Sequence, residues 1–403
     1  MSAREAGTAK RHGPDWVLLT IVIMLLVIGL IAVYSASYAL GYAAHDDSDY
    51  YIKRQLMWAA LGCAGMLAAS VIDYRWLRRI SPLLMLLALV GLCAALVPGI
   101  GVSAFEDGPR RWIEIGPFSG QPSEIAKLAV IVYLSAWLAA KGPTVRDFQL
   151  GVVPFVAMVG LVTALVLLEP DLGTALLIAA ITGTLFFVSG ARLTHLVALA
   201  VTAVGFTAAF VVAGGYGMTR ILSFTSAETD PEGFGFQTLQ MLIALGSGGW
   251  TGLGLGVSRQ KFFFVPAAHT DGILSIIGEE LGFVGVTVVL LLFVLLLWRG
   301  LRIMQRAADP FGSFLVAGIL MWIALQVLIN VGGVTRSIPL TGITLPFLSY
   351  GGSSLAVTLT AIGILLSVSR YAALDDPAGE PPSRGVVREE RKGRRRRAAA
   401  TSR

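Results

Sequence analysis

A few ionisable side chains in this sequence stand next to long apolar segments, and they are of the types used in acid–base chemistry and anion binding. Asp271 immediately precedes one apolar segment, and His269 lies two residues before it. An aspartate there either caps the following helix or acts as a general base that removes a proton from a hydroxyl group. Lys261, ten residues upstream, is a candidate cation for an anionic substrate. Glu279 would lie about 12 Å deeper along a helix that starts at Asp271.

A second group of charges stands at the start of another apolar segment. Pro122 and Ser123 are typical of a helix start, with Ser123 as the N-cap. Glu124 and Lys127 are three residues apart, so they share one helix face and are within reach of an ion pair. Such a pair either lets the helix enter an apolar environment or holds a cation ready for an anionic substrate. In the second case, Arg111 supplies a further positive charge.

Two further segments interrupt the apolar pattern. The sequence Glu169-Pro170-Asp171 indicates a helix break, after which Asp171 caps the next helix. Residues 339–352 contain two prolines and three glycines, which predict a non-helical segment. Irregular backbone at a membrane boundary must be buried by protein or line a wet cavity. This segment, which includes Ser349, is therefore a candidate wall of a substrate groove.

Metal and nucleotide chemistry have little support in the sequence. The four histidines and two cysteines are scattered without the ligand spacing of a zinc site. Cys63 and Cys93 each lie inside an apolar run, where a free cysteine behaves as a small core residue. The glycine-rich residues 248–256 lack the surrounding βαβ unit that a dinucleotide-binding loop requires.

The composition shows what kind of protein must position these side chains. Hydrophobic residues make up 55% of the 403-residue chain and charged residues only 14%, whereas a soluble domain carries about 25% charged residues. The mean hydropathy is +0.75. These values exclude an ordinary soluble enzyme, a disordered protein and a disulfide-stabilised scaffold. They indicate a polytopic membrane protein.

The predicted fold is all-α, with about ten transmembrane helices, because a helix needs about 20 apolar residues to cross the hydrocarbon core. Ten segments meet this description, near residues 16–38, 54–72, 81–98, 123–140, 149–168, 171–188, 193–214, 272–298, 311–333 and 351–369. The first is too long for the apolar region of a signal peptide. Together they form one membrane domain over residues 16–371.

The distribution of Lys and Arg predicts the orientation of this domain. With the N-terminus inside, the inner segments carry 22 Lys and Arg residues and the outer segments carry eight. Without the C-terminal tail the comparison is still 12 to eight, so both termini are predicted to be cytoplasmic. The sizeable outer segments are then residues 39–53, 99–122 and 215–271. The last, between helices seven and eight, is rich in glycine and aromatic residues, includes an amphipathic stretch at 236–245, and is expected to be ordered.

Two polar tails flank the membrane domain. Residues 1–15 form a short N-terminal tail, and residues 372–403 form a basic tail with a linker-like start. A basic tail can bind nucleic acid, but a disordered cytoplasmic tail close to anionic lipid is the favoured interpretation.

Six motifs, taken in order, resemble the SEDS family (shape, elongation, division and sporulation), whose members include RodA and FtsW. They are Arg111-Trp112-Ile113, Gln121-Pro122-Ser123-Glu124 with Lys127, Pro170-Asp171-Leu172-Gly173-Thr174, His269-Thr270-Asp271, Glu279-Glu280-Leu281-Gly282 and Ser349-Tyr350-Gly351-Gly352-Ser353-Ser354. The resemblance covers residues 15–371. The segment from Gly254 to Lys261 is more similar to the division-type FtsW. The family usually has Asp-Phe where this chain has Asp271-Gly272.

The resemblance implies a peptidoglycan glycosyltransferase that polymerises lipid II at the outer face of the bacterial cytoplasmic membrane, for division or elongation. Asp271 is then the expected general base, and Arg111 and Lys127, with Lys261, are the expected cations for the diphosphate. Glu124 would hold Lys127 in place. The expected substrate-binding residues also include His269, Glu279 and Ser349. The resemblance further implies a class B penicillin-binding transpeptidase as partner. From the interpretation of the basic tail, no nucleic-acid partner is expected. A divalent cation could share the diphosphate role, although the sequence shows no dedicated metal cage.

Two other classes of function are compatible with ten helices and buried charges. A lipid flippase or transporter would place its polar site near the bilayer midplane, often at broken helices in repeated halves. The polar residues here gather at the outer boundary instead, and no clear internal repeat is visible. A non-catalytic scaffold of the division machinery would have no need of Asp271.

Overall fold

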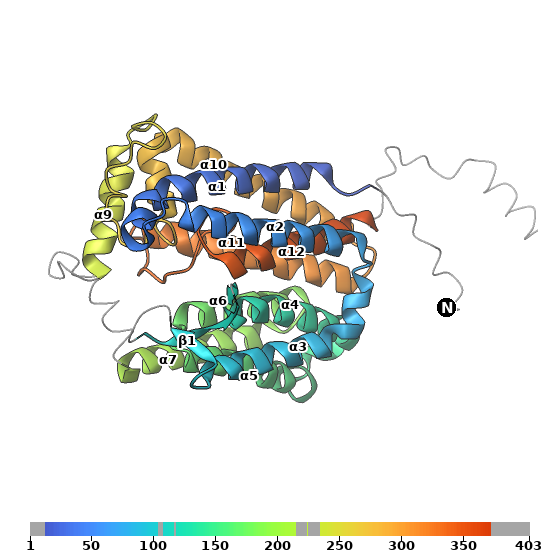
Figure 1. Ribbon diagram of the computed structural model, residues 1–403. Coiled ribbons are helices and arrows are strands. Elements are labelled where there is room, and N and C mark those ends of the chain that lie inside the picture. The colour runs from blue at the N-terminus through green and yellow to red at the C-terminus, as the bar shows by residue number, and fades with distance from the viewer. Residues whose placement is uncertain (1–12, 104–107, 117, 215–223, 225–233, 372–403) are drawn as a thin grey trace, which may run out of the picture.

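The computed structural model describes residues 13–103, 108–116, 118–214, 224 and 234–371, which form a helical bundle (Figure 1). All ten predicted segments are helical. The helices are α1 (Trp16–His45), α2 (Tyr50–Val71), α3 (Arg75–Leu96), α4 (Pro122–Lys141), α5 (Val153–Leu168), α6 (Leu172–Val188), α7 (Leu193–Gly214), α9 (Phe234–Ser247), α10 (Ile273–Gln305), α11 (Pro310–Val334) and α12 (Gly352–Arg370). A 3₁₀ turn (Gly142–Arg146) and a π-type turn (Phe148–Val152) connect α4 to α5.

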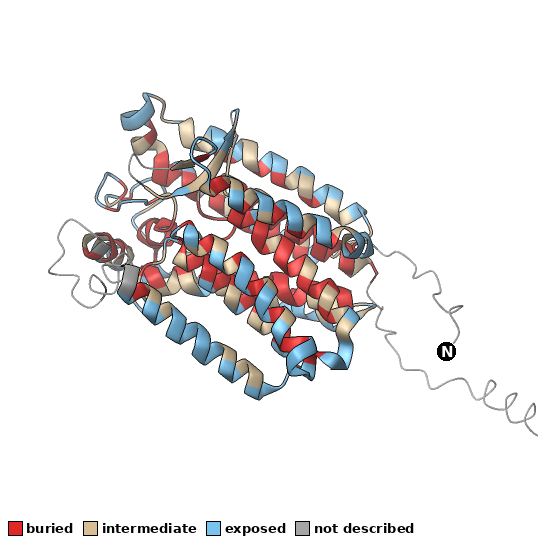
Figure 2. Cartoon of the chain, turned by 90° about the horizontal axis from the view of Figure 1, so that it is seen from below, coloured by how far each residue is buried: buried red, intermediate tan, exposed pale blue. Residues whose placement is uncertain are grey.

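The helices fall into two groups that pack against each other. Figure 1 shows α1, α2, α10, α11 and α12 in one half of the molecule and α3 to α7 in the other. Each half has its own cluster of buried apolar side chains, and Ile131 of α4 and Leu185 of α6 meet Gly318 of α11 between the halves. Buried residues concentrate in the middle of the bundle, and exposed residues lie on the outer helix faces (Figure 2).

The outer faces of the bundle are apolar, as a lipid environment requires. Val201 and Val204 on α7, for example, are 68% and 70% exposed. Eight of the described helices are long and apolar enough to cross a membrane, and α6, with 17 residues, is a shorter apolar helix. Because lipid offers no hydrogen-bond partners, helices that satisfy their own backbone groups are the stable form of such segments. The prediction of a polytopic all-α membrane protein is confirmed.

Three details differ from the sequence-based predictions. Helix α1 continues to His45 and α2 starts at Tyr50, so most of residues 39–53 is helical and no sizeable loop stands there. Residues 99–122 contain a small antiparallel sheet in the order β1 (Gly101–Ser103), β2 (Arg110–Ile115) and β3 (Phe118–Gly120). Cys63 packs against the core, but Cys93 is exposed on the bundle surface, so the prediction of a core residue is wrong for Cys93.

The two ends of the bundle differ in character. One end, here called the loop end, carries the sheet, α9, residues 248–272 and residues 335–351 (Figure 1). The described termini meet at the opposite end, where the Asp15 amide donates to Ser369 Oγ (3.4 Å) and Arg299 Nε pairs with Asp15 Oδ2 (2.7 Å). Residues 236–245, predicted to be amphipathic, lie within α9. Three stretches lie outside the described residues: residues 1–12 of the predicted 1–15 tail, the predicted tail at 372–403, and residues 215–233 except 224.

Candidate active site

Asp271 lies in the turn before α10 and is 7% exposed. Gly272, and not Asp271, occupies the N-cap position of α10. Thr270 Oγ1 donates to Asp271 Oδ1 at 3.2 Å. The Asn330 amide, from α11, donates to the backbone carbonyls of Asp271 (3.0 Å) and Ile343 (2.8 Å). Asn330 therefore fixes the backbone at Asp271 against the 335–351 segment.

Glu124 and Lys127 form the predicted ion pair in the first turns of α4. Lys127 Nζ is 2.9 Å from Glu124 Oε1, and both side chains are buried. The ammonium group also lies 5.0 Å from the centre of the Trp322 ring, which comes from α11. Glu124 Oε2 has no hydrogen-bond partner among the described residues. Burying an ion pair with an unused hydrogen-bond acceptor costs free energy of folding. A ligand-binding role for the pair is consistent with this cost.

The predicted cap of α4 is wrong in one detail. The N-cap is Gln121, with Pro122 in the first helical position, and the buried Ser123 Oγ makes no hydrogen bond within the described structure. Pro at the first helical position fits a helix start because its missing N–H would have no partner there. The Gln121 side-chain amide donates to Asp171 Oδ2 at 3.2 Å, and the Gln121 backbone N–H donates to Ser353 Oγ at 3.2 Å. This residue therefore joins the start of α4 to the start of α6 and to α12.

Arg111 on strand β2 reaches the break between α5 and α6. Its Nε donates to the Glu169 carbonyl at 2.8 Å, and a second N–H donates to the Pro170 carbonyl. Asp171 caps α6 as predicted, because its carboxylate accepts from the Thr174 amide (3.0 Å) and hydroxyl (2.8 Å). A guanidinium has five N–H donors, so Arg111 keeps donors for a further ligand.

Glu169 sits fully buried at this break, and both carboxylate oxygens lack partners among the residues that the structure describes. Burial raises the pKa of Glu169 to about 8, with the neighbouring Asp171 adding to the rise and Arg111 opposing it. The folded protein therefore holds a proton on Glu169 at neutral pH, whereas the unfolded chain, with a glutamate pKa near 4.3, does not.

This protonation predicts a decline in stability as the pH rises. Between about pH 4.3 and the raised pKa of about 8, unfolding releases the Glu169 proton, so each step up in pH favours the unfolded chain. We expect the melting temperature in detergent to fall between pH 5 and pH 8, and Glu169→Gln to reduce that slope. The two proteins should melt at similar temperatures at pH 5 and diverge at pH 8. Identical slopes would show that Glu169 is ionised in the fold.

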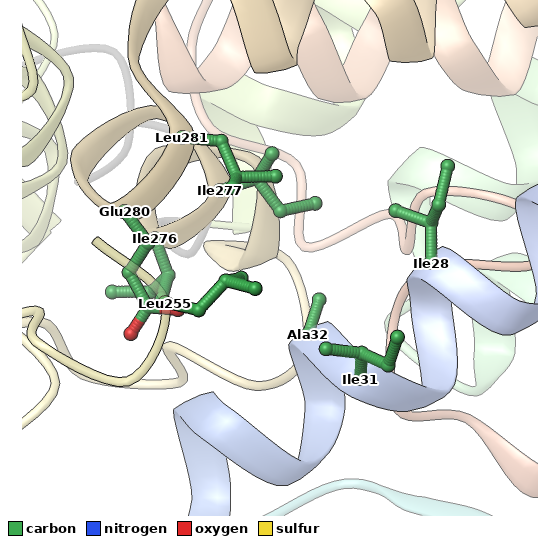
Figure 3. A pocket seen from close by; sticks show the side chains of 8 residues that line it. All are labelled: Ile28, Ile31, Ala32, Leu255, Ile276, Ile277, Glu280 and Leu281. Carbon is green, nitrogen blue, oxygen red and sulfur yellow. The ribbon is translucent and has the colours of Figure 1, made fainter. Parts of the chain in front are cut away.

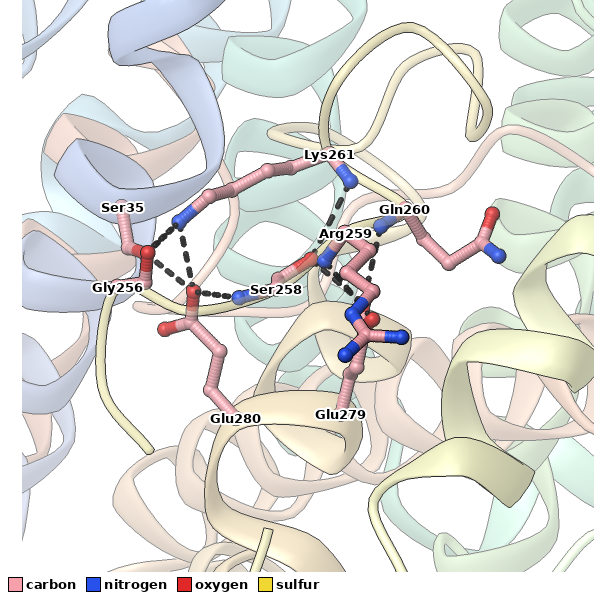
Figure 4. Close-up of polar contacts among 8 residues, drawn as sticks. All are labelled: Ser35, Gly256, Ser258, Arg259, Gln260, Lys261, Glu279 and Glu280. Carbon is pink, nitrogen blue, oxygen red and sulfur yellow. Dashed lines mark hydrogen bonds and ion pairs between the residues drawn. The ribbon is translucent and has the colours of Figure 1, made fainter. Parts of the chain in front are cut away.

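Lys261 and the two glutamates of α10 form a buried network with the 256–261 segment (Figure 4). Lys261 Nζ lies 2.9 Å from Glu280 Oε1, 2.7 Å from the Gly256 carbonyl and 3.1 Å from Ser35 Oγ on α1. Its side chain is 0% exposed. Because Glu280, the Gly256 carbonyl and Ser35 occupy all three N–H donors of this enclosed ammonium group, we do not assign Lys261 to the diphosphate. It ties the loop to α1 and α10.

Glu279 anchors the neighbouring turn of the same loop (Figure 4). Its carboxylate accepts from Ser258 Oγ (2.5 Å), the Arg259 amide (2.9 Å) and the Gln260 amide (3.4 Å). Three donors from one turn occupy the carboxylate, so these contacts hold the loop that leads to Asp271. A direct substrate contact by Glu279 stays a prediction.

Helix α10 is interrupted at Gly282, and the glycine-rich loop satisfies the freed backbone groups. The Leu253 and Gly254 amides donate to the carbonyls of Glu279 and Glu280 at 2.9 and 3.0 Å. In return, the amides that follow Gly282 donate to the carbonyls of Gly249 (2.9 Å) and Trp250 (3.1 Å). The glycine-rich run thus completes a broken helix, which explains its composition without a nucleotide.

Gly282 is predicted to be essential for this junction. Its φ of 66° and ψ of −166° are a conformation available essentially to glycine alone. An added Cβ would lie 2.4 Å from the Gly252 nitrogen and 2.6 Å from the Trp250 carbonyl. We expect Gly282→Ala to destabilise the protein by at least about 1–3 kcal/mol, measured as a lower melting temperature. Gly183→Ala, in an open position on α6, is the matched control and should cause no loss. Equal melting temperatures for the two variants would contradict the prediction.

An apolar pocket of about 130 Å³ adjoins the Lys261 network, between α1 and α10 (Figure 3). Its lining is aliphatic apart from Glu280, and Asp271 is not part of it. Ile31 and Leu255 at its margin are 50% and 62% exposed, so the pocket opens on the lipid-facing surface. Its chemistry suits hydrocarbon and gives no support to a diphosphate site.

His269 and Ser349 lie on two segments that a backbone hydrogen bond joins beside the Asp271 turn. The Tyr350 amide donates to the His269 carbonyl at 2.8 Å. Burial lowers the pKa of His269 to about 4, so its ring is neutral at neutral pH. Ser349 Oγ accepts from the Leu345 amide (2.8 Å), and its carbonyl accepts from Gln55 on α2 (3.1 Å). The Ser349 hydroxyl therefore holds its own turn, and substrate contact by either residue stays a prediction.

The sequence reasoning missed two residues that organise this region, Gln55 and Asn330. Gln55 follows Lys53 and Arg54 near the start of α2, whereas Asn330 stands inside an apolar run of α11, and each ties its helix to the 335–351 segment. An amide in an apolar run is a usable signal, because burying it without a partner is costly. Within the described ranges, no group of three or more His, Cys, Asp or Glu side chains could hold a metal ion, so the possible divalent cation has no assigned ligands.

The fold and the site together define a multi-pass membrane protein. Its buried ionic pair and non-capping aspartate lie at one end of an apolar helical bundle. Comparisons with known proteins give the family. The model of the FtsW, RodA and SpoVE proteins, described as "Cell cycle protein", matches residues 15–374. The chain belongs to this family, and the resemblance seen in the sequence is confirmed.

Individual relatives match over most of their length. Stage V sporulation protein E of Bacillus subtilis (strain 168) is 46% identical over 365 residues, which cover 91% of this chain and 99% of that protein. A protein of Trichlorobacter lovleyi named "Probable peptidoglycan glycosyltransferase FtsW" is 42% identical and covers 88% of this chain, with 93% of its own length matched.

Solved structures share the fold. The rod shape determining protein RodA of Thermus thermophilus has a TM-score of 0.66 at 28% identity, and the match covers 90% of this chain and 98% of that one. A chain from a structure described as "Structural coordination of polymerization and crosslinking by a peptidoglycan synthase complex" has a TM-score of 0.72 at 28% identity, over 89% of this chain and 98% of that chain.

Proposed function

We propose that this protein is a peptidoglycan glycosyltransferase that polymerises lipid II. The observation that carries the proposal is the buried Asp271 carboxylate in the turn before α10, which Asn330 fixes against the 335–351 segment at the loop end. The names of the FtsW relatives and the synthase complex among the structural neighbours support the same activity.

The reaction joins two disaccharide units by a β-1,4 bond. The 4-hydroxyl oxygen of one sugar attacks C1 of the other, and its proton passes to the Asp271 carboxylate. The bond from C1 to the diphosphate oxygen breaks, and undecaprenyl diphosphate leaves with the electron pair, so the configuration at C1 inverts. A hydroxyl is a poor nucleophile at neutral pH, and a base positioned within hydrogen-bond reach of it contributes about 10²–10⁴-fold in rate.

The departing diphosphate needs positive charge where its own charge develops. Arg111 and Lys127 are the proposed cations. Each has N–H donors beyond those used in the fold, since Arg111 commits two to carbonyls and Lys127 commits one to Glu124. Glu124 holds the Lys127 ammonium group in position, and lipid II is the substrate that completes the site.

The proposed location is the cytoplasmic membrane, with the loop end outside and both termini inside. The excess of Lys and Arg on the segments at the opposite end supports this orientation. A class B penicillin-binding transpeptidase is the proposed partner, since a neighbouring structure is described as a complex that coordinates polymerisation and crosslinking.

The test is polymerisation of fluorescent lipid II by the purified protein, alone and with a class B transpeptidase, read as a ladder of glycan strands on a gel. We expect polymer from the complex and none from an Asp271→Asn complex. Transfer of lipid II between leaflets of proteoliposomes without polymer would favour the flippase alternative. Neither activity in a well-folded complex would favour the scaffold alternative.

A further inference from the structure

Five aromatic side chains form a continuous series of ring contacts at the loop end. His45 stacks on Tyr50 with centroids 3.6 Å apart, and Tyr50 lies edge-on to Tyr51 at 5.2 Å. Tyr51 then contacts His269 at 4.8 Å and Tyr350 at 5.3 Å, and His269 and Tyr350 are 5.3 Å apart. These five residues, here called the aromatic cluster, come from the end of α1, the start of α2, the turn before α10 and the segment before α12.

The aromatic cluster borders the proposed catalytic carboxylate. His269 precedes Asp271 by two residues. The hydrogen bond from the Tyr350 backbone amide to the His269 carbonyl (2.8 Å) joins the turn before α10 to the segment before α12. On the other side of the turn, Asp271 Oδ2 faces Gly342, where an added Cβ would lie 4.0 Å from that oxygen. Asp271 and the cluster member His269 therefore share the turn before α10.

The rings of the aromatic cluster are neither fully buried nor fully exposed. Tyr50, Tyr51, His269 and Tyr350 are each partly buried, so they pack against one another and still present surface. Tyrosines are common at membrane interfaces, where they lie around the circumference of a bundle. Tyr42 on α1 is such a residue, with 64% of its surface exposed. The cluster differs because two of its rings, Tyr51 and Tyr350, contact His269, which precedes Asp271 by two residues.

We propose that the aromatic cluster is a binding platform for the N-acetylhexosamine rings of the glycan. This inference rests on the proposed function and names a contact surface for its substrate. The axial C–H groups of a β-linked pyranose form an apolar face that stacks on the electron-rich face of a tyrosine ring. The phenol groups and the neutral His269 ring offer donors and acceptors to the sugar hydroxyls. Arg54, 4.7 Å from the Tyr50 ring centre, adds a cation at the margin.

The platform can be tested by direct binding of a soluble glycan to the full-length protein in nanodiscs. The probe is chitotetraose, a β-1,4-linked N-acetylglucosamine oligomer, with the α-linked maltotetraose as comparison, measured by saturation-transfer NMR. We expect Tyr51→Leu to weaken chitotetraose binding about tenfold, the equivalent of one lost aromatic contact. Tyr51→Phe, which keeps the ring, should bind within about twofold of the native protein by the same conversion. Tyr42→Leu is the matched control and should bind as the native protein does.

Several outcomes overturn the platform. They are equal binding by Tyr51→Leu and Tyr42→Leu, equal response to both sugars, and no saturable chitotetraose signal from the native protein. If Tyr51→Leu does not fold, Tyr50→Leu provides the same comparison at the edge of the cluster. Asp271→Asn should still bind chitotetraose, which separates the platform from catalysis. Chitotetraose binding without any lipid II polymerisation by the native complex would contradict the proposed function and leave the platform standing.

A second measurement identifies which sugar occupies the platform. If the rings hold the growing strand, Tyr51→Leu shortens the glycan products while the first coupling of two lipid II molecules continues at the native rate. If they hold the incoming unit, the apparent KM for lipid II rises and product length is unchanged. Native product length together with a native KM would overturn the proposal.

Discussion

Asp271→Asn is expected to lower lipid II polymerisation by about 10²–10⁴-fold, because an amide does not accept a proton from the sugar hydroxyl at working pH. The fold should be retained. Asparagine has nearly the same size and can still accept the Thr270 hydrogen bond at Oδ1, and the Asn330 contact goes to the backbone carbonyl. Since Gly272 is the N-cap of α10, no helix cap is lost. The measurement is glycan yield per unit time, alongside lipid II binding and the melting temperature.

The matched control is the same change at a true helix cap. Asp309 caps α11 at the opposite end, where its carboxylate accepts from the Gly312 amide at 2.9 Å and from the Tyr74 hydroxyl at 2.5 Å. Asp309→Asn removes the charge that pairs with Arg75 Nε (3.1 Å), so it should lower the melting temperature and leave polymerisation largely intact. Near-native glycan yield from Asp271→Asn would eliminate the general-base assignment. Lost binding with a lower melting temperature would assign Asp271 a structural role instead.

Lys127→Met is expected to lower polymerisation by about 10²–10³-fold, the effect of removing one charge that stabilises a developing anion. Methionine keeps the apolar stem of the side chain. It also leaves the Glu124 carboxylate buried without its partner, and breaking a buried pair costs about 3–5 kcal/mol. The single variant should therefore lose both activity and thermal stability, which alone cannot separate a catalytic from a structural role.

The double variant Glu124→Gln with Lys127→Met separates the two roles. It removes both charges, so the melting temperature should recover toward the native value. Polymerisation should stay absent, because the cation is still missing. Lys53→Met is the control for loss of a lysine from an ion pair. Its partner is Asp47, and the pair is exposed, with side chains 62% and 40% accessible, so both activity and stability should persist. A stable double variant that polymerises at the native rate would show that the pair serves the fold only.

Features that depend on neighbouring residues were predictable from the sequence. The ten helices follow from continuous apolar runs, because every backbone group in lipid needs a partner within its own segment. The Glu124–Lys127 pair follows from a spacing of three residues on a helix. The Asp171 cap follows from an aspartate directly after a proline break, and it forms because the next turn offers the Thr174 amide.

Features that join distant segments were decided only by the tertiary structure. Ser35 on α1, Lys261 on the loop and Glu280 on α10 form one hydrogen-bonded group. Lys261, which the sequence suggested as a cation for the diphosphate, is therefore enclosed by these contacts. The break in α10 at Gly282 exists because the glycine-rich loop is present to satisfy its carbonyls and amides. Local spacing specifies which face of a helix a residue occupies. The neighbours that this face contacts depend on the path of the whole chain. The ring contacts of Tyr51 with His269 and Tyr350, close to Asp271, are an example, because these residues are far apart in the sequence.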